Sequence, residues 1–104
     1  MNKIPITDDI LLKNGFELNE LKAEDIQVHN EIWGIDDYRL YTLWTNEEYS
    51  LKIDMEWKCT NNGANWHIHI DDDHCETIGC ADINYVEQFN LMMEIFESKF
   101  KLKP

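Results

Sequence analysis

Apolar residues recur at every second position in two stretches of the chain, residues 49–58 and 66–71. A period of two is typical of strands that bury one face and expose the other. The residues predicted to point into the core are Tyr49, Leu51, Ile53, Met55, Trp57, Trp66, Ile68 and Ile70. The opposite face of the sheet is predicted to carry His29, Glu31, Lys52, Asp54, Glu56, His67 and His69.

Further strands are predicted over residues 26–33, 38–45 and 77–81. The segments between the strands are short and polar. Residues 34–37 are typical of a turn, residues 46–48 of a hairpin connection, and Asn61-Asn62-Gly63 is a strong turn signal. Because such connections are too short for crossovers, they favour an antiparallel meander.

Helical patterns flank the strands on both sides. Over residues 7–15, Thr7 is a candidate N-cap and Asn14-Gly15 a candidate C-terminal exit. A second, longer helix is predicted to begin at a capping Asp82. Its apolar stripe consists of Ile83, Val86, Phe89, Met93, Phe96 and Phe100. Four apolar residues lie off this stripe: Tyr85, Leu91, Met92 and Ile95. Either the first helix covers them or they form a dimer contact.

These patterns predict an α+β fold in a single domain, residues 1–104. Its one antiparallel sheet would have four to five strands, with the short N-terminal and the long C-terminal helix packed on the same face. A hydrophobic content of 43% is enough for a real core. The three cysteines, without an export signal or a long apolar run, indicate reduced thiols and a cytoplasmic protein that does not enter a membrane.

Charge narrows the choice of partner. The chain has 21 Asp and Glu against 9 Lys and Arg, a net charge of -12, and no basic residue lies between Lys58 and Lys99 or within residues 23–38. Such a chain repels nucleic acid, so we expect it to bind a basic protein surface instead, such as that of a nuclease or another nucleic-acid-binding protein. The candidate partner-binding residues are Glu31, Asp36, Asp37, Asp71, Asp72, Asp73, Glu76, Glu87, Glu94 and Glu97.

The two ends of the chain carry a resemblance. Residues 6–16, Ile-Thr-Asp-Asp-Ile-Leu-Leu-Lys-Asn-Gly-Phe, and residues 82–96, which include Tyr85-Val86, are together similar to short uncharacterised proteins of Bacteroidetes genomes and prophages. This chain has Glu87 where those proteins tend to have His after Tyr-Val. The resemblance implies a prophage-like setting and no particular activity.

Metal binding is the main chemical alternative. His67 and His69 project from the same face of a strand and could chelate one metal ion, although their spacing matches no standard zinc module. Motifs for nucleophilic, phosphate-binding or dinucleotide-binding chemistry are absent, so we expect neither an enzyme nor a cofactor.

Three functions therefore stay open. The first is an acidic interaction protein that occupies a nucleic-acid-binding surface by imitating phosphates, in the manner of an anti-defence inhibitor of the phage type (anti-CRISPR-like). The second is a metal-binding domain that uses His67 and His69. The third is a soluble scaffold or homodimer whose charge serves solubility only.

Overall fold

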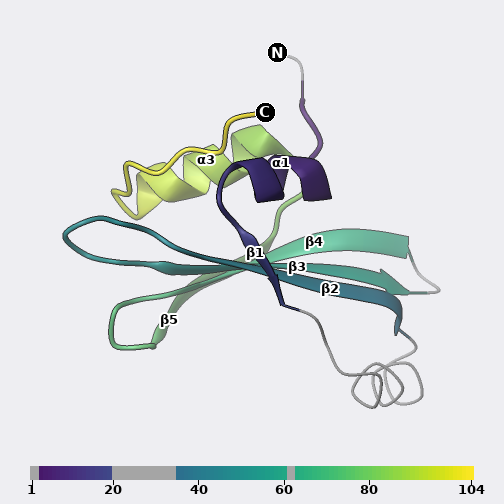
Figure 1. The fold of residues 1–104 in the computed structure, drawn as a ribbon, viewed down its shortest axis with the longest axis horizontal. Helices are drawn as coiled ribbons and strands as arrows, with labels where there is room; N and C mark the ends of the chain where they lie inside the picture. The colour runs from purple at the N-terminus through teal and green to yellow at the C-terminus, as the bar shows by residue number, and fades with distance from the viewer. Residues whose placement is uncertain (1–2, 20–34, 61–62) are drawn as a thin grey trace.

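The computed structural model describes residues 3–19, 35–60 and 63–104. Within these residues the chain forms one five-stranded antiparallel sheet and two helices (Figure 1). The elements are α1 (Asp8–Lys13), β1 (Glu17–Asn19), β2 (Ile35–Trp44), β3 (Lys52–Thr60), β4 (Gly63–Asp71), β5 (Thr77–Asp82) and α3 (Val86–Ile95). The strands lie in chain order, which confirms the predicted α+β meander.

The helix α1 forms where its capping residues predict it. The Thr7 hydroxyl accepts a hydrogen bond from the backbone N–H of Ile10 at 3.2 Å, and Asn14 caps the other end. Gly15 follows with φ of 95°, a conformation that glycine adopts without strain. The short helix buries Leu11 completely, so one turn and a half suffices to anchor it on the sheet.

The alternating residues of β3 and β4 form the centre of the core. Ile53, Met55, Ile68 and Ile70 are fully buried, as the period of two predicts. Tyr49 is wrongly predicted: its side chain is 74% exposed, because β3 begins only at Lys52 and Tyr49 lies in the preceding loop.

The start of β2 also differs from the prediction. Residues 35–37 belong to the strand and not to a turn, since Ile35 pairs with Thr60 and Asp37 with Cys59 across a β-bulge. The strand predicted over residues 26–33 lies outside the described residues, as do Asn61 and Asn62 of the predicted turn.

The boundary between β5 and α3 corrects the predicted helix start. Asp82 does not cap the helix: it is the last residue of β5 and pairs with His67. The N-cap is Tyr85, whose backbone N–H donates to the Gln88 side chain at 3.2 Å. Because α3 ends at Ile95, the predicted stripe residue Phe100 packs on the core from the segment that follows the helix.

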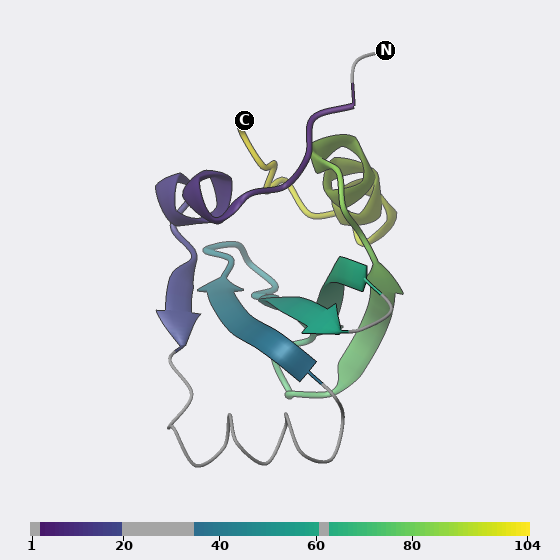
Figure 2. The same cartoon turned by 90° about the vertical axis from the view of Figure 1, so that its right-hand side faces the viewer.

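Both helices lie on the same face of the sheet, α1 over the β1 side and α3 over the β5 side (Figure 2). Phe89 and Met93 of α3 are fully buried. Leu91 and Ile95 are 60% and 76% exposed, so α1 does not cover them. In the described parts of the chain, no helix has the length and apolarity needed to cross a membrane.

Candidate functional site

The predicted aspartate run lies in the loop between β4 and β5, where its members have different roles. One oxygen of Asp72 accepts hydrogen bonds from the backbone N–H groups of His74 and Glu76, each at 2.9 Å. This carboxylate therefore shapes the turn, as Asp commonly does. Asp73 and Glu76 are exposed, so this loop offers their carboxylates to a partner.

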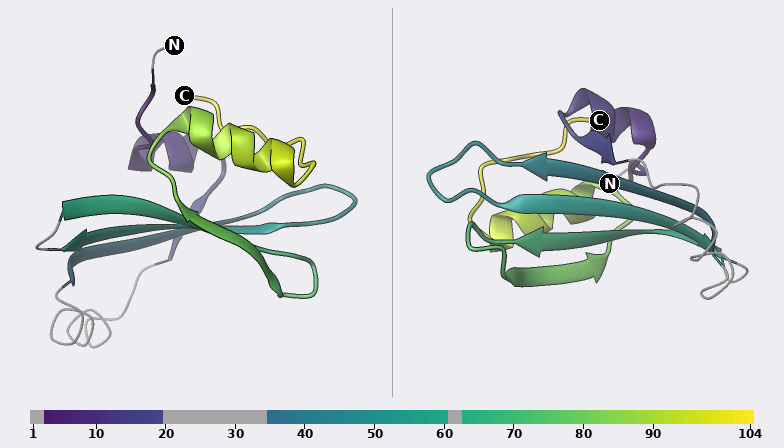
Figure 3. Two further views of the ribbon diagram at one scale, coloured as in Figure 1. Left: turned by 180° about the vertical axis from the view of Figure 1, so that it is seen from behind. Right: turned by 60° about the horizontal axis from the view of Figure 1, so that its bottom comes forward.

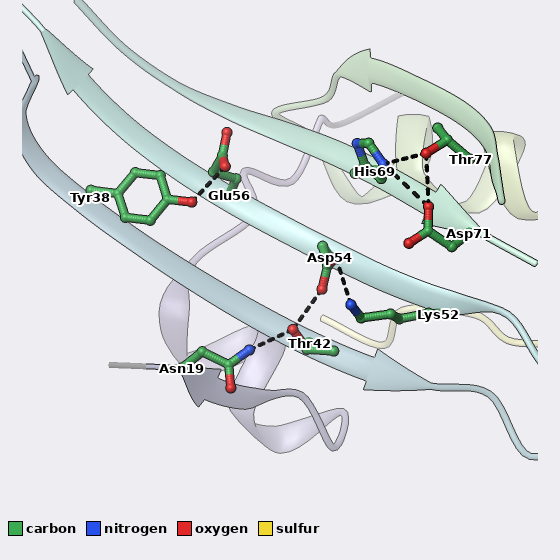
Figure 4. A network of polar contacts seen from close by, with 9 residues as sticks. All are labelled: Asn19, Tyr38, Thr42, Lys52, Asp54, Glu56, His69, Asp71 and Thr77. Atoms are coloured by element: carbon green, nitrogen blue, oxygen red, sulfur yellow. Dashed lines mark hydrogen bonds and ion pairs between the residues drawn. The ribbon is translucent and has the colours of Figure 1, made fainter. Parts of the chain in front are cut away.

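The side chain of Asp71 lies on the face of the sheet away from the helices and is hydrogen-bonded there. Its Oδ1 accepts the Thr77 hydroxyl at 3.0 Å and lies 3.2 Å from His69 Nε2 (Figure 4). Only 14% of its side chain is exposed. Asp71 thus closes the β4–β5 hairpin and offers little charge to solvent.

The loop between β2 and β3 adds acidic residues that the sequence analysis missed. Glu47 accepts hydrogen bonds from the backbone N–H of Lys99 at 2.6 Å and from the Ser98 hydroxyl at 3.1 Å. It fastens the loop to the segment after α3. Glu48, its neighbour, is exposed.

The C-terminal part of α3 contributes the last two predicted carboxylates. Glu94 lies 3.3 Å from the ammonium group of Lys101, at a surface where such a pair is screened by water. Glu97 follows the helix with φ of 57° and is exposed. The carboxylate that stays available here is that of Glu97.

These segments lie at the same end of the strands. One residue from each of the four strands β2 to β5 is aligned across the sheet: Trp44, Lys52, Asp71 and Thr77. The β2–β3 and β4–β5 loops therefore leave the sheet at the same end of the strands. Glu47 joins the segment after α3 to the β2–β3 loop, and Figure 3 shows the end of the helix beside that loop, while the β4–β5 loop turns to the other side of the sheet. We call the four exposed carboxylates of Glu48, Asp73, Glu76 and Glu97 the acidic end.

The remaining predicted partner-binding residues do not join the acidic end. Asp36 and Asp37 lie near the start of β2, and Asp37 pairs with Cys59, seven residues along β3 from Lys52. At about 3.3 Å per residue, roughly 23 Å separates them from the β4–β5 loop. Glu87 lies in the first turn of α3, where its carboxylate accepts the backbone N–H of Ile4 at 3.0 Å. Glu31 lies outside the described residues.

His67 and His69 share the open face of the sheet, as predicted, but each has a separate partner. His67 Nδ1 lies 2.9 Å from Asp82, and this hydrogen bond lowers the pKa of the Asp82 carboxyl. His69 Nε2 lies 2.8 Å from the Thr77 hydroxyl. Among residues 3–19, 35–60 and 63–104, no group of three or more His, Cys, Asp or Glu side chains is arranged to hold a metal ion.

The rest of the open face is a network of hydrogen bonds between neighbouring strands (Figure 4). The Tyr38 hydroxyl donates to Glu56 at 2.6 Å, and Lys58 lies 2.7 Å from the same carboxylate. Burial alone would raise the pKa of Glu56, but the bonds from Lys58 and Tyr38 outweigh it and lower that pKa. The Thr42 hydroxyl accepts a hydrogen bond from the Asn19 side-chain amide at 2.7 Å and donates one to Asp54 at 2.6 Å. Glu56 and Asp54 thus have hydrogen-bond and ion-pair partners within the sheet.

No protein-family model, curated protein or solved structure matches this chain. The geometry of the described residues therefore carries the functional argument.

Proposed function

We propose that the protein is an acidic interaction module whose acidic end docks on a basic, nucleic-acid-binding surface of another protein and blocks it. The observation that carries this proposal is that the loops with Glu48, Asp73 and Glu76 leave the sheet at the same end, where Glu47 also binds the segment after α3 that includes Glu97. Among the described residues, the other predicted acids are either engaged in the fold or distant from that end.

The physical basis is electrostatic competition. A basic channel that holds a phosphate backbone attracts any rigid surface with carboxylates at comparable spacing. Asp72 fixes the backbone of the loop that carries Asp73 and Glu76, and Glu47 ties the β2–β3 loop to the segment after α3 that carries Glu97. This backbone therefore loses little conformational entropy on binding. Occupying such a channel excludes nucleic acid, which is the action of an inhibitor. This role fits the prophage-like setting that the resemblance implies.

The test is a capture experiment with a matched pair of variants. Immobilised wild-type protein is exposed at low salt to lysate of the cells that encode it, and bound proteins are identified by mass spectrometry. We expect a nucleic-acid-binding protein that added DNA or RNA displaces. The double variant Glu48→Gln with Glu76→Gln should lose most of this capture.

The control removes the same amount of charge elsewhere. Asp9 and Glu17 are exposed, on α1 and β1, and the variant Asp9→Asn with Glu17→Gln has the same net charge as the first. It should capture the partner as wild type does. Equal capture by both variants, or capture that salt does not weaken, would show that the acidic end is not the contact surface.

A further inference from the structure

We infer that the acidic end recognises arginine in particular, through a hollow between the β2–β3 loop and the end of α3. This inference rests on the proposed function and deepens it. It names the side chain of the partner that the surface accepts and separates arginine from positive charge in general.

The hollow has a volume of about 390 Å³. Tyr49 and Phe96 provide aromatic surface, and Leu51 lies at the buried side. The rest of the lining is polar or charged: Asn46, Glu47, Glu48, Glu97 and Lys99. Tyr49 is 74% exposed, although Leu51, Ile53 and Met55 of the same alternation are buried. An aromatic side chain held open beside a half-buried phenylalanine is a surface suited to stacking.

The shape is fixed before any partner arrives. Glu47 ties the β2–β3 loop to Ser98 and Lys99, and the Thr45 hydroxyl accepts the backbone N–H of Leu51 at 2.8 Å. The loop that carries Tyr49 and Glu48 is therefore anchored at its base and across to the helix end. A preorganised hollow loses less entropy on binding than a mobile one.

The lining chemistry selects a guanidinium group. A planar guanidinium stacks on an aromatic face and still donates along its edge to carboxylates such as those of Glu48 and Glu97. A lysine ammonium is compact and strongly hydrated, so it gains the carboxylates but little from the aromatic surface. Lys99 lines the same hollow and repels a second cation, which makes the stacking contribution more decisive.

The experiment compares labelled nona-arginine and nona-lysine peptides by fluorescence anisotropy at low salt. We expect wild type to bind nona-arginine about five-fold more tightly than nona-lysine, which corresponds to one favourable cation–π contact. Tyr49→Ala should abolish this preference without changing the charge. Trp44→Ala is the matched control, since Trp44 is 51% exposed but lies outside the hollow, and it should keep the preference.

The outcomes separate this inference from the proposed function. Equal affinity of wild type for the two peptides, or a preference that survives Tyr49→Ala, overturns the arginine hollow. In that case the acidic end still stands if Glu48→Gln with Glu76→Gln weakens both peptides and Asp9→Asn with Glu17→Gln does not. If neither peptide binds wild type, both proposals fail.

Discussion

At the scale of single residues, the acidic side chains divide into those that hold the fold and those that face solvent. Asp72 closes a turn, Glu47 fastens a loop and Glu87 holds the N-terminal segment, each by accepting backbone N–H groups. Hydrogen bonds to charged acceptors are stronger than neutral ones. Part of the net charge therefore stabilises the fold, and only the rest is available to a partner.

Glu87 tests this division. Replacing Glu87 with Ala should destabilise the protein by about 1 kcal/mol, because the backbone N–H of Ile4 loses its acceptor. Glu94→Ala removes only an exposed ion pair and should cost about 0.5 kcal/mol or less. Urea denaturation measures both. Binding of the nona-arginine peptide should be unchanged in Glu87→Ala, and a clear loss of binding would place Glu87 in the contact surface after all.

Ionisation of Tyr38 should lower the stability of the protein at alkaline pH. Burial, followed by its hydrogen bond to Glu56, raises the pKa of Tyr38 above the ordinary value of 10.0. The folded state thus favours the neutral phenol. The contribution of Tyr38 to the free energy of unfolding is complete below the pKa that Tyr38 has in the unfolded state, and it is lost as the pH rises from that pKa toward the higher pKa of the folded state. We expect stability to fall above about pH 10. Because the pKa of Tyr41 is also raised by burial, part of the fall should persist in any Tyr38 variant.

The variant Tyr38→Phe separates the two contributions. At pH 7 it should cost about 1 kcal/mol, because Glu56 loses a donor. Between about pH 9.5 and 11 its stability should fall less steeply than that of wild type. Urea denaturation at a series of pH values gives the slopes. Parallel slopes would mean that Tyr38 ionises no differently in the folded and unfolded states.

At the scale of elements, residue patterns predict what a strand or helix buries better than where it ends. The alternation that marks Ile53 and Met55 as buried continues back to Tyr49, because a period of two does not show where a loop begins. Asp82 is a good local cap signal, but its carboxylate bonds to His67 on the neighbouring strand. Tertiary contacts decided both boundaries, and no local pattern contains them.

Tertiary contacts also explain why the acids of the β2–β3 loop were not predicted as part of the candidate site. Stretches without basic residues pointed to the acids of the β4–β5 loop, but Lys52 follows Glu47 and Glu48 closely in the chain and hides them from such a search. Their approach to Glu97 depends on how α3 lies on the sheet. Convergence of separate segments is a property of topology. The sequence predicted an antiparallel meander, but not the edge strand β1 and not which acids the fold would engage.

The packing of α3 on β5 depends on Gly79. A Cβ atom at this position would lie 2.6 Å from the Phe96 ring and 3.2 Å from the end of Met92. Gly79→Ala should therefore push the end of α3 away from the sheet and destabilise the protein by about 1–3 kcal/mol. The neighbouring Cys80 is exposed, so Cys80→Ala should have little effect. Thermal unfolding of the two variants compares them directly, and an unchanged melting temperature for Gly79→Ala would show that Phe96 moves aside freely.

At the scale of the whole molecule, charge and shape work against each other. A net charge of -12 on 104 residues repels itself, and the fold places four exposed carboxylates at one end, besides exposed acids elsewhere such as Asp9, Glu17 and Asp82. Concentrating like charges lowers stability but strengthens the field that steers a basic partner. A protein selected for solubility alone gains nothing from this convergence, which is why the arrangement favours recognition.

Salt should reveal this cost. Between 10 and 200 mM NaCl we expect the melting temperature to rise by about 2–5 °C, because the added ions screen the repulsion. The salt-induced increase in melting temperature should be smaller for Glu48→Gln with Glu76→Gln than for Asp9→Asn with Glu17→Gln. The two variants have the same net charge, but only the first removes charges from the acidic end. A melting temperature that falls with salt would mean that ion pairs such as Arg39–Asp8 and Lys58–Glu56 outweigh the repulsion. Identical salt dependence of the two variants would mean that the acids repel one another only through total charge, and the acidic end would then lose its electrostatic distinction.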